Sequence, residues 1–165
     1  MKLYQLRSKQ GLATSQKLAW EFLSNPANLA TITPEHMGFT ILSGADRPMF
    51  AGQIIQYQVS PFPFYSTKWV TEITHVKEGE YFVDEQRFGP YALWHHKHFI
   101  KPIKGGVEME DIIDFKIPFG LLGQLAYPLV VKKQLQQIFK HREEKLNELF
   151  GTLENCPHKL EFKSI

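Results

Sequence analysis

The chain contains one cysteine, Cys156, among its 165 residues, so an internal disulfide is excluded and a reducing compartment is indicated. No apolar run follows the charged residues of the N-terminal MKLYQLRSKQ, and no signal peptide is therefore expected. No stretch approaches the ~18 consecutive apolar residues that a membrane span requires. The net charge is only +2, without the basic stripe that nucleic-acid binding needs. These absences predict a cytoplasmic protein that neither inserts into a membrane nor binds nucleic acid.

Aromatic residues, in contrast, are plentiful. They make up 13% of the chain, with 13 phenylalanines, against an ordinary 43% of apolar and 22% of charged residues. A share of this kind favours a large core or a hydrophobic cavity. The length fits one domain, which we expect over residues 1–150. Residues 151–165 show no periodicity and are expected to form a loosely ordered tail.

The order of predicted elements indicates an α+β protein with an antiparallel sheet of about seven strands. Ser15 is expected to cap a helix over 16–23, and a short helix is expected over 26–32. The long amphipathic helix over 132–150 follows a segment that Pro128 interrupts, and Gly151 ends it. Strands are expected at 3–9, 39–42, 53–59, 68–76 and 81–88 and in two runs on either side of Lys104-Gly105-Gly106, with a turn or bulge at Pro61-Phe62-Pro63.

The two runs around Lys104-Gly105-Gly106 predict a β-hairpin. Because strand side chains alternate, one face of this hairpin carries Trp94, His96, His98 and Ile100 on the first strand and Met109, Asp111, Ile113, Phe115 and Ile117 on the second. Both stripes are apolar at their ends and polar in the middle, which is typical of the lining of a pocket. A hydrogen bond between Asp111 and one of the two histidines is expected across the pair.

The same alternation, continued to the other strands, defines the two faces of the sheet. The expected concave face carries Tyr57, Trp69, Thr71, Phe82, Asp84, Gln86, Trp94, His96, His98, Asp111 and Phe115. The opposite face carries Glu72, Glu85, Arg87, Lys97, Glu108, Glu110 and Asp114. These seven charges favour the solvent, since each would cost several kcal/mol if it were buried without a partner. Arg142 lies on the apolar side of the long helix, where it can meet a carboxylate of the sheet or of a ligand.

Several short motifs resemble the SRPBCC superfamily of START-like and polyketide cyclase-like proteins, and within it the bacterial branch of ligand-binding SRPBCC domains. They are Phe22-Leu23-Ser24-Asn25-Pro26, Ile32-Thr33-Pro34, Phe82-Val83-Asp84, Gly89-Pro90-Tyr91, Trp94-x-His96-x-His98, Met109-x-Asp111, Pro118-Phe119-Gly120, and Phe139 with Arg142. The resemblance covers residues 1–150 and departs at His141, where the branch leads us to expect a tyrosine. It implies the helix-grip fold, in which a curved antiparallel sheet wraps around a long C-terminal helix, and a pocket for a hydrophobic ligand.

The polar residues of the concave face have four interpretations. They form a buried network that fixes the strand register, or they anchor the polar end of a ligand in an apolar pocket. Catalysis by a His–Asp base, with His96 or His98 and Asp111, is a third, although nothing supplies a nucleophile and Cys156 in the tail is a poor one. A metal site of His96, His98 and Asp111 or Asp84 is the fourth, but nothing else marks one, and neither a metal nor another cofactor is expected.

The function expected from these patterns is the binding of a hydrophobic or amphipathic small molecule, such as a lipid, an isoprenoid, a polyketide or an aromatic metabolite, between sheet and helix. The expected ligand-binding residues are the concave set, without catalytic assignments, together with Arg142. An aromatase/cyclase-type enzyme that uses the His–Asp pair is the alternative, so enzymatic activity stays open. A protein-interaction module that uses Phe50, Phe62 and Phe64 is a second alternative.

Overall fold

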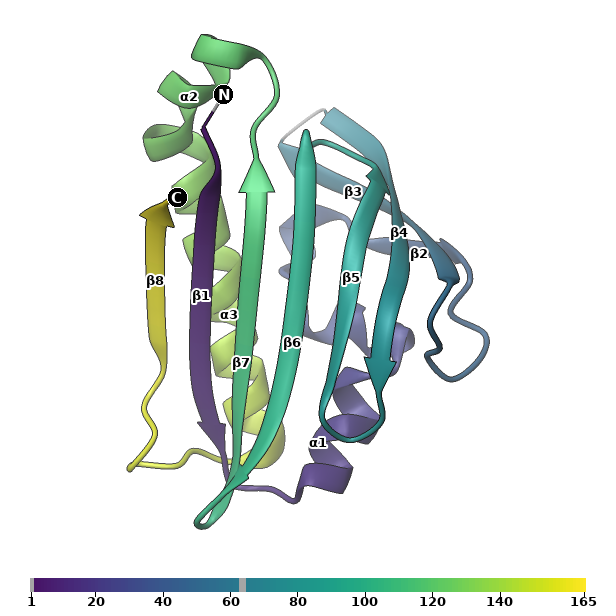
Figure 1. Cartoon of the computed structure of the whole chain (residues 1–165), viewed down its shortest axis with the longest axis vertical. Helices are drawn as coiled ribbons and strands as arrows, with labels where there is room; N and C mark the ends of the chain where they lie inside the picture. Colours follow the sequence, from purple (N-terminus) through teal and green to yellow (C-terminus); the bar gives the residue numbers. More distant parts are fainter. Residues whose placement is uncertain (1, 63–64) are drawn as a thin grey trace.

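Eight strands form one sheet that curves around a long C-terminal helix (Figure 1). The computed structural model describes the backbone of residues 2–62 and 65–165. The strands are β1 (Tyr4–Leu12), β2 (Thr40–Ser43), β3 (Gln53–Phe62), β4 (Tyr65–Lys77), β5 (Tyr81–Phe88), β6 (Leu93–Ile103), β7 (Gly106–Lys116) and β8 (Lys159–Ser164). The helices are α1 (Gln16–Leu23), the 3₁₀ turns η1 (Pro26–Ile32) and η2 (Glu35–Met37), α2 (Gly120–Ala126), the π-helical turn η3 (Tyr127–Val131) and α3 (Lys132–Phe150). The predicted α+β helix-grip architecture is confirmed.

The sheet has the order β2-β3-β4-β5-β6-β7-β1-β8, and each neighbouring pair is antiparallel. β1 lies between β7 and β8, one strand from the edge of the sheet, and does not pair with the strand that follows it in sequence. The expected irregularity near Pro61 is present as a register shift between Val59 and Phe62, within β3. Among the described residues, no helix combines the length and the apolar character needed to cross a membrane.

Local sequence signals account for the helix ends. The Ser15 hydroxyl accepts a hydrogen bond from the backbone N–H of Leu18 (3.2 Å) and starts α1. The Asn25 side chain does the same for Ala27 at the start of η1. Gly151 ends α3 with φ 78°, a conformation that favours glycine. Pro128 lies in the π-helical turn between α2 and α3, where the regular hydrogen-bond pattern is interrupted.

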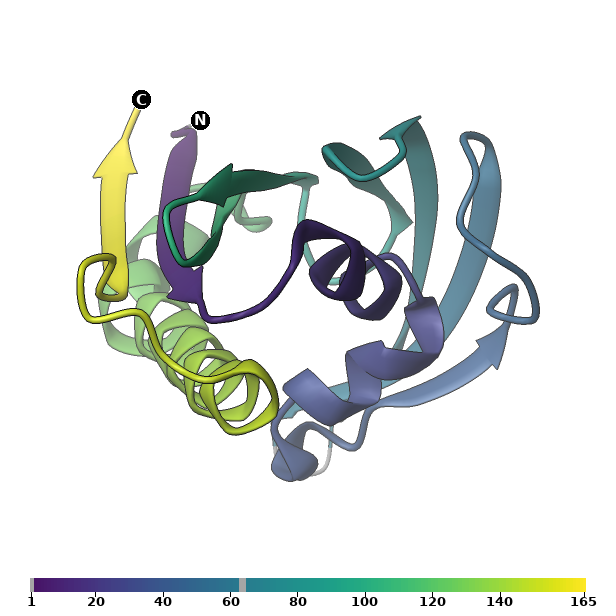
Figure 2. The same cartoon turned by 90° about the horizontal axis from the view of Figure 1, so that it is seen from below.

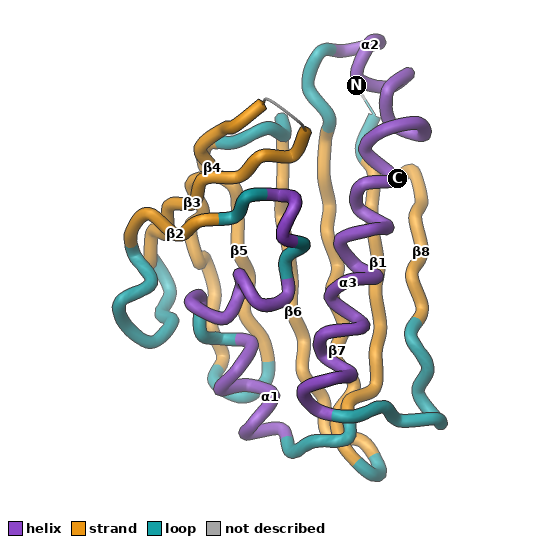
Figure 3. The backbone as a smooth tube through the Cα atoms, turned by 180° about the vertical axis from the view of Figure 1, so that it is seen from behind, coloured by secondary structure: helices purple, strands orange, loops and turns teal. Residues whose placement is uncertain are grey.

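Helices cover the concave side of the sheet in two places (Figures 2 and 3). α3 lies along β1 and β7, whereas α1 and η1 lie over the other half, with α1 against β6. Buried apolar side chains accordingly gather in three clusters rather than in one core. One joins β1, β7 and α3 around Phe115, one joins α1 to the hairpin end of β6 and β7 around Met109, and one lies on β3 and β4 around Ile55. The space between the clusters is available for a cavity.

The expectation of a loosely ordered tail over residues 151–165 is wrong. Residues 159–164 form β8, which pairs with β1 so that Phe162 lies opposite Leu6. Leu160 and Phe162 pack against the cluster around Phe115. The preceding turn lies tightly on Gly11, where a Cβ atom would come within 2.6 Å of Cys156 Cβ. The alternation in Lys159–Ser164 is short and lies between charged residues, so the sequence pattern did not reveal the strand.

We expect Phe162→Ala to lower the free energy of unfolding by about 1–2 kcal/mol, because the ring is half-buried against β1 and α3. The matched control is Lys163→Ala, at the next residue of β8, whose side chain is exposed and whose loss should change stability by less than about 0.5 kcal/mol. Urea denaturation measures both. Equal midpoints for the two variants would show that β8 does not stabilise the domain.

Candidate functional site

The strand register brings the ionisable residues of the concave face together. Gly105, with φ 90°, closes the tight turn of the β6–β7 hairpin, and the resulting register sets His98 opposite Asp111. On the other side of β6, the pairing with β5 sets Asp84 opposite His96. Two carboxylates therefore flank the two histidines of one strand, at the centre of the sheet.

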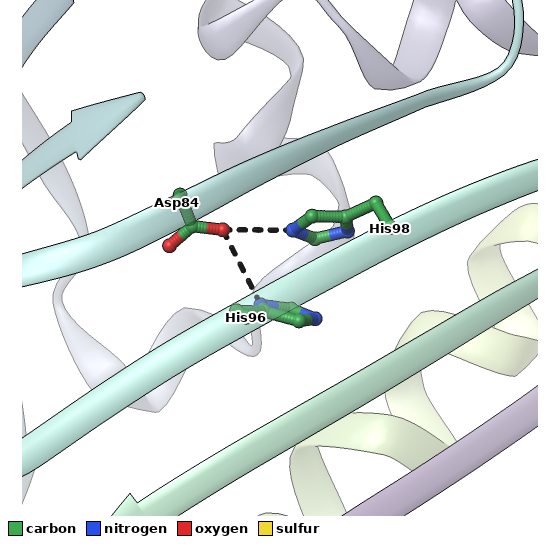
Figure 4. Close-up of side chains that lie close together, drawn as sticks. All are labelled: Asp84, His96 and His98. Atoms are coloured by element: carbon green, nitrogen blue, oxygen red, sulfur yellow. Dashed lines mark hydrogen bonds and ion pairs between the residues drawn. The ribbon is translucent and has the colours of Figure 1, made fainter. Parts of the chain in front are cut away.

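Asp84 connects the two histidines on the side of β5 (Figure 4). Its Oδ2 atom lies 2.8 Å from Nε2 of His98, within hydrogen-bond range, and 3.5 Å from Nδ1 of His96. The imidazole rings lie with their centroids 3.6 Å apart, and His98 also stacks on Phe82 at 4.1 Å. The rings are thereby held between a carboxylate and an aromatic side chain, in a fixed orientation.

Asp111 contacts the same two rings from the β7 side. Its Oδ1 atom lies 3.2 Å from Nε2 of His96, in a hydrogen bond, and 2.7 Å from Nδ1 of His98, outside the angular range of a hydrogen bond. Arg142 of α3 brings its Nη2 atom to 3.4 Å from the same oxygen. Because the Asp111 side chain has no exposed surface, its charge depends on these neighbours for compensation. Of the two fates expected for Arg142, pairing with a carboxylate of the sheet is the one seen.

These surroundings shift the pKa values of the two histidines in opposite directions. Burial, together with the neighbouring His98, lowers the pKa of His96 to about 4 despite its carboxylate contacts. Burial also acts to lower the pKa of His98, but the contacts with Asp111 and Asp84 outweigh it and raise that pKa above its ordinary value. Burial favours the neutral form of Asp111 as well, yet Arg142 and the two histidines hold its pKa well below the ordinary value. The shifts thus favour the charged forms of Asp84, Asp111 and His98 and the neutral form of His96.

The cluster lies in the wall of a cavity of about 660 Å³ between the sheet and the helices. Of the expected site residues, those that line it are Tyr57, Trp69, Thr71, Phe82, Asp84, Trp94, His96, His98 and Arg142. Asp111 and Phe115 are completely buried and are not in the lining. Gln86 is not in the lining either, because its amide is hydrogen-bonded to both backbone groups of Tyr91. It fixes the loop between β5 and β6 instead.

Sequence reasoning missed the walls that lie outside the sheet. These are formed by Phe22, Leu23, Leu29 and Ile32 of α1 and η1, by Met37, Phe39 and Met49, by Tyr91, and by Ile117, Phe119, Leu122, Val130, Val131, Leu135, Ile138 and Phe139. Tyr91 packs with Trp69 and Trp94, at ring-centroid distances of 5.8 and 4.7 Å. Two features of the sequence could have indicated these lining residues: the aromatic Tyr91 in the Gly-Pro-Tyr turn and the apolar stretch of η1. The direction of a loop side chain cannot, however, be predicted from periodicity.

The opposite face also carries His95, whose Nδ1 atom lies 3.2 Å from Glu85 Oε1. One expectation about this face needs correction. Glu110 is buried rather than exposed, with a side-chain exposure of 5%, because Arg7 of the neighbouring β1 covers it at 2.7 Å. The charges on this face are neutralised in pairs across strands, as in the contact of 2.7 Å between Lys97 and Asp114.

Among the described residues, Asp84, His96 and His98 are a group able to offer donors to a metal ion, with their ligand atoms within 4.8 Å of one another. The Asp84 carboxylate and the two imidazoles form a common donor set for transition metals. The short contact between Asp84 and His98 is, however, already a hydrogen bond, so a metal would have to displace its proton.

No family model matches the sequence, and no curated protein matches it. Solved structures of similar fold are found. Protein CV1439 from Chromobacterium violaceum matches with a TM-score of 0.66 at 15% identity, over 90% of this chain and 99% of that one. TTHA0849 from Thermus thermophilus matches with 0.65 at 12% identity, over 88% and 98%. Ara h 8.0201 matches with 0.59 at 12% identity, over 88% and 99%. At such identities the likeness shows the fold alone, which is the helix-grip fold.

We expect the two imidazoles to titrate far apart in the folded protein. His96 should stay neutral down to pH about 4, and His98 should remain charged above its ordinary pKa of 6.5. The stabilisation from His98 is therefore complete below pH 6.5 and is lost as the pH rises through its raised pKa. That from His96 is present above pH 6.5 and is lost as the pH falls toward 4. Nitrogen-15 NMR of the side chains measures both, and two titrations near pH 6.5 would contradict the described network.

Removal of the Asp111 carboxylate should be costly. We expect Asp111→Ala to lower the free energy of unfolding by about 3–5 kcal/mol, because it leaves Arg142 buried without its partner. Asp114→Ala is the matched control on the same strand. It breaks a partly exposed pair with Lys97 and a hydrogen bond from Gln5, and should cost about 1 kcal/mol. Chemical denaturation compares them, and a cost for Asp111→Ala no larger than that of the control would refute the structural role.

Proposed function

We propose that this protein binds a hydrophobic or amphipathic small molecule in the cavity between the sheet and α3. The observation that supports this function is the cavity itself, about 660 Å³ in volume and within the range of ~300–1,000 Å³ typical of ligand sites. A cavity of this size with a largely apolar lining is large enough to enclose a small molecule. A protein that served only as an interaction surface would gain from a filled core.

The polar part of the wall suggests the chemistry of the ligand. Arg142 lines the cavity and is buried. Its Nε–H group finds no hydrogen-bond acceptor in the part of the chain that the structure describes. A ligand with an oxygen acceptor at one end and an apolar body would satisfy this donor and cover the aromatic wall around Trp94. Lipids, isoprenoids, polyketides and aromatic metabolites all include molecules of this kind. A place in the ligand-binding branch of the SRPBCC superfamily belongs to the same proposal.

An aromatase/cyclase-type enzyme is the second candidate, and the His96–Asp111 hydrogen bond beside the cavity is the observation in its favour. Its chemistry needs a base that is free near neutral pH. The raised pKa of His98 favours its protonated form, and His96, with a pKa of about 4, is a weak base. Both are better suited to hydrogen bonding with a ligand than to abstracting its proton, so binding is the preferred function.

The third expectation, an interaction module, depended on three phenylalanines. Phe50 is exposed by 44%, which agrees with a contact surface. The side chain of Phe62 and the whole of Phe64 lie outside the described residues. The hollow interior therefore remains the feature that distinguishes the candidates, and it favours a binding protein.

The proposal is tested by filling the cavity. Thr71 is buried and lines the cavity, so Thr71→Phe should weaken the binding of an apolar fluorescent probe by about tenfold or more, because its ring occupies the site. Thr40→Phe, on the exposed face of β2, is the matched control and should bind the probe like the wild type. Fluorescence titration with 1-anilinonaphthalene-8-sulfonate gives both affinities. Absence of saturable binding to the wild type, or equal affinities for the two variants, would refute the proposal.

A further inference from the structure

Five large apolar side chains stand exposed on the segment that joins β7 to α3. They are Phe119 (81% exposed), Leu121 (77%), Leu122 (74%), Leu125 (71%) and Leu129 (68%), which we call the apolar ledge. Single exposed apolar residues are normal on a soluble protein, but a contiguous group of this kind marks an interaction site. Nothing in the network of Asp84, His96, His98 and Asp111 accounts for the ledge.

The exposed leucines of the ledge are regularly spaced. Leu121, Leu125 and Leu129 follow one another at helical spacing of four residues, so they share one side of α2 and η3. Figures 1 and 3 show α2 beyond the end of β7, clear of the sheet. Phe119 begins α2 with φ 67°, a backbone conformation that bulky residues rarely adopt. The chain thus turns sharply after β7 and presents α2 outward.

The charge of this region has one sign. Between Asp114 and Glu143 the sequence contains no acidic residue, whereas it contains Lys116, Lys132, Lys133, Lys140 and Arg142. Lys133 is exposed and is the second residue after η3. In the ranges 2–62 and 65–165, no carboxylate lies within ion-pair distance of Lys116, Lys132 or Lys133. The lysines on either side of the ledge in the sequence therefore have no carboxylate partner among the described residues, and Lys132 lies over the Phe162 ring at 5.4 Å.

The shape and the charge together identify the partner. The ledge projects from the molecule, so it suits insertion into a soft surface rather than the reception of a peptide. A second copy of the chain, packed symmetrically on the ledge, would bring the same lysines against one another. An anionic bilayer surface suits both the apolar side chains and the lysines. Leucine and phenylalanine side chains enter the acyl boundary, while lysines contact the headgroups. We propose that the apolar ledge docks this protein on the surface of a bilayer that carries anionic lipid headgroups.

Docking in this way has a consequence for the cavity. Phe119 and Leu122 of the ledge also line the cavity, as does the partly exposed Val130 of η3. Side chains that are both exposed and in the lining mark an opening, so a docked molecule would present this opening to the acyl chains. A hydrophobic ligand would then pass between bilayer and cavity without crossing water. This last step rests on the proposed function, whereas the docking does not.

The experiment is co-sedimentation of the full chain with vesicles of phosphatidylcholine, with and without phosphatidylglycerol. Binding is expected to the phosphatidylglycerol vesicles and to weaken as salt rises, since charges are screened over about 10 Å at 0.1 M ionic strength. Leu125→Ser with Leu129→Ser should reduce the partition coefficient by about tenfold or more. Leu18→Ser is the matched control, because Leu18 is an exposed leucine (53%) on α1, away from the ledge. It should bind like the wild type.

Lys132→Gln with Lys133→Gln should remove most of the salt dependence and leave the fold unchanged, which circular dichroism verifies. Failure of the wild type to bind phosphatidylglycerol vesicles would overturn the proposal, as would equal losses in the Leu18 and the Leu125/Leu129 variants. It would also be overturned if the wild type formed dimers in sedimentation equilibrium that the Leu125/Leu129 variant did not form. Thr71→Phe separates the two proposals, because it should abolish probe binding and still sediment with the vesicles.

Discussion

A carboxylate without any contact with water is the constraint on which this structure depends. Asp111 is fully buried at the centre of β7, and its charge persists only where cations and hydrogen-bond donors surround it. β6 contributes the imidazoles of His96 and His98, and α3 contributes Arg142. One residue thereby ties the helix to the middle of the sheet and sets the pairing of two strands. Displacement of α3 by one turn would separate Arg142 from Asp111 and leave the buried guanidinium without this carboxylate.

The contact between Arg142 of α3 and Asp111 of β7 explains how the domain can be hollow. On one side of it, α3 packs through Leu135 and Phe139 against β1 and β7, and near its C-terminal end Leu146 packs beside Met109. β3 and β4, at the other side of the sheet, pack around Ile55, and among the described residues α3 adds no side chain to this cluster. The helix is thus held along one edge and need not close against the remaining strands. The aromatic wall of Trp69 and Trp94 is left facing open space rather than a packed layer.

The sequence allowed prediction of the features that produce a periodic pattern of side chains, such as strand faces and helix faces. Alternation located the strands and put His96, His98 and Asp111 on one face, and helical spacing placed Arg142 on the buried side of α3. It did not separate Gln86, on the same face, from the lining, because the hydrogen bonds of Gln86 to Tyr91 depend on the path of a loop. Glu110 also escaped prediction, since its burial results from Arg7, a residue of β1 more than a hundred positions away. Long-range pairing of this kind, like that of β8 with β1, leaves no local pattern.

The position of β8 has a consequence for how molecules of this protein meet one another. A long strand at the border of a sheet offers unpaired backbone groups to other chains and promotes polymerisation. The nine-residue β1 would be such a border, but β8 covers it. The borders that remain are the four-residue β2 and the six-residue β8, whose Lys159, Glu161 and Lys163 are exposed. Short and charged borders oppose edge-to-edge growth, so a protein with an open interior keeps its sheet from becoming a template for fibres.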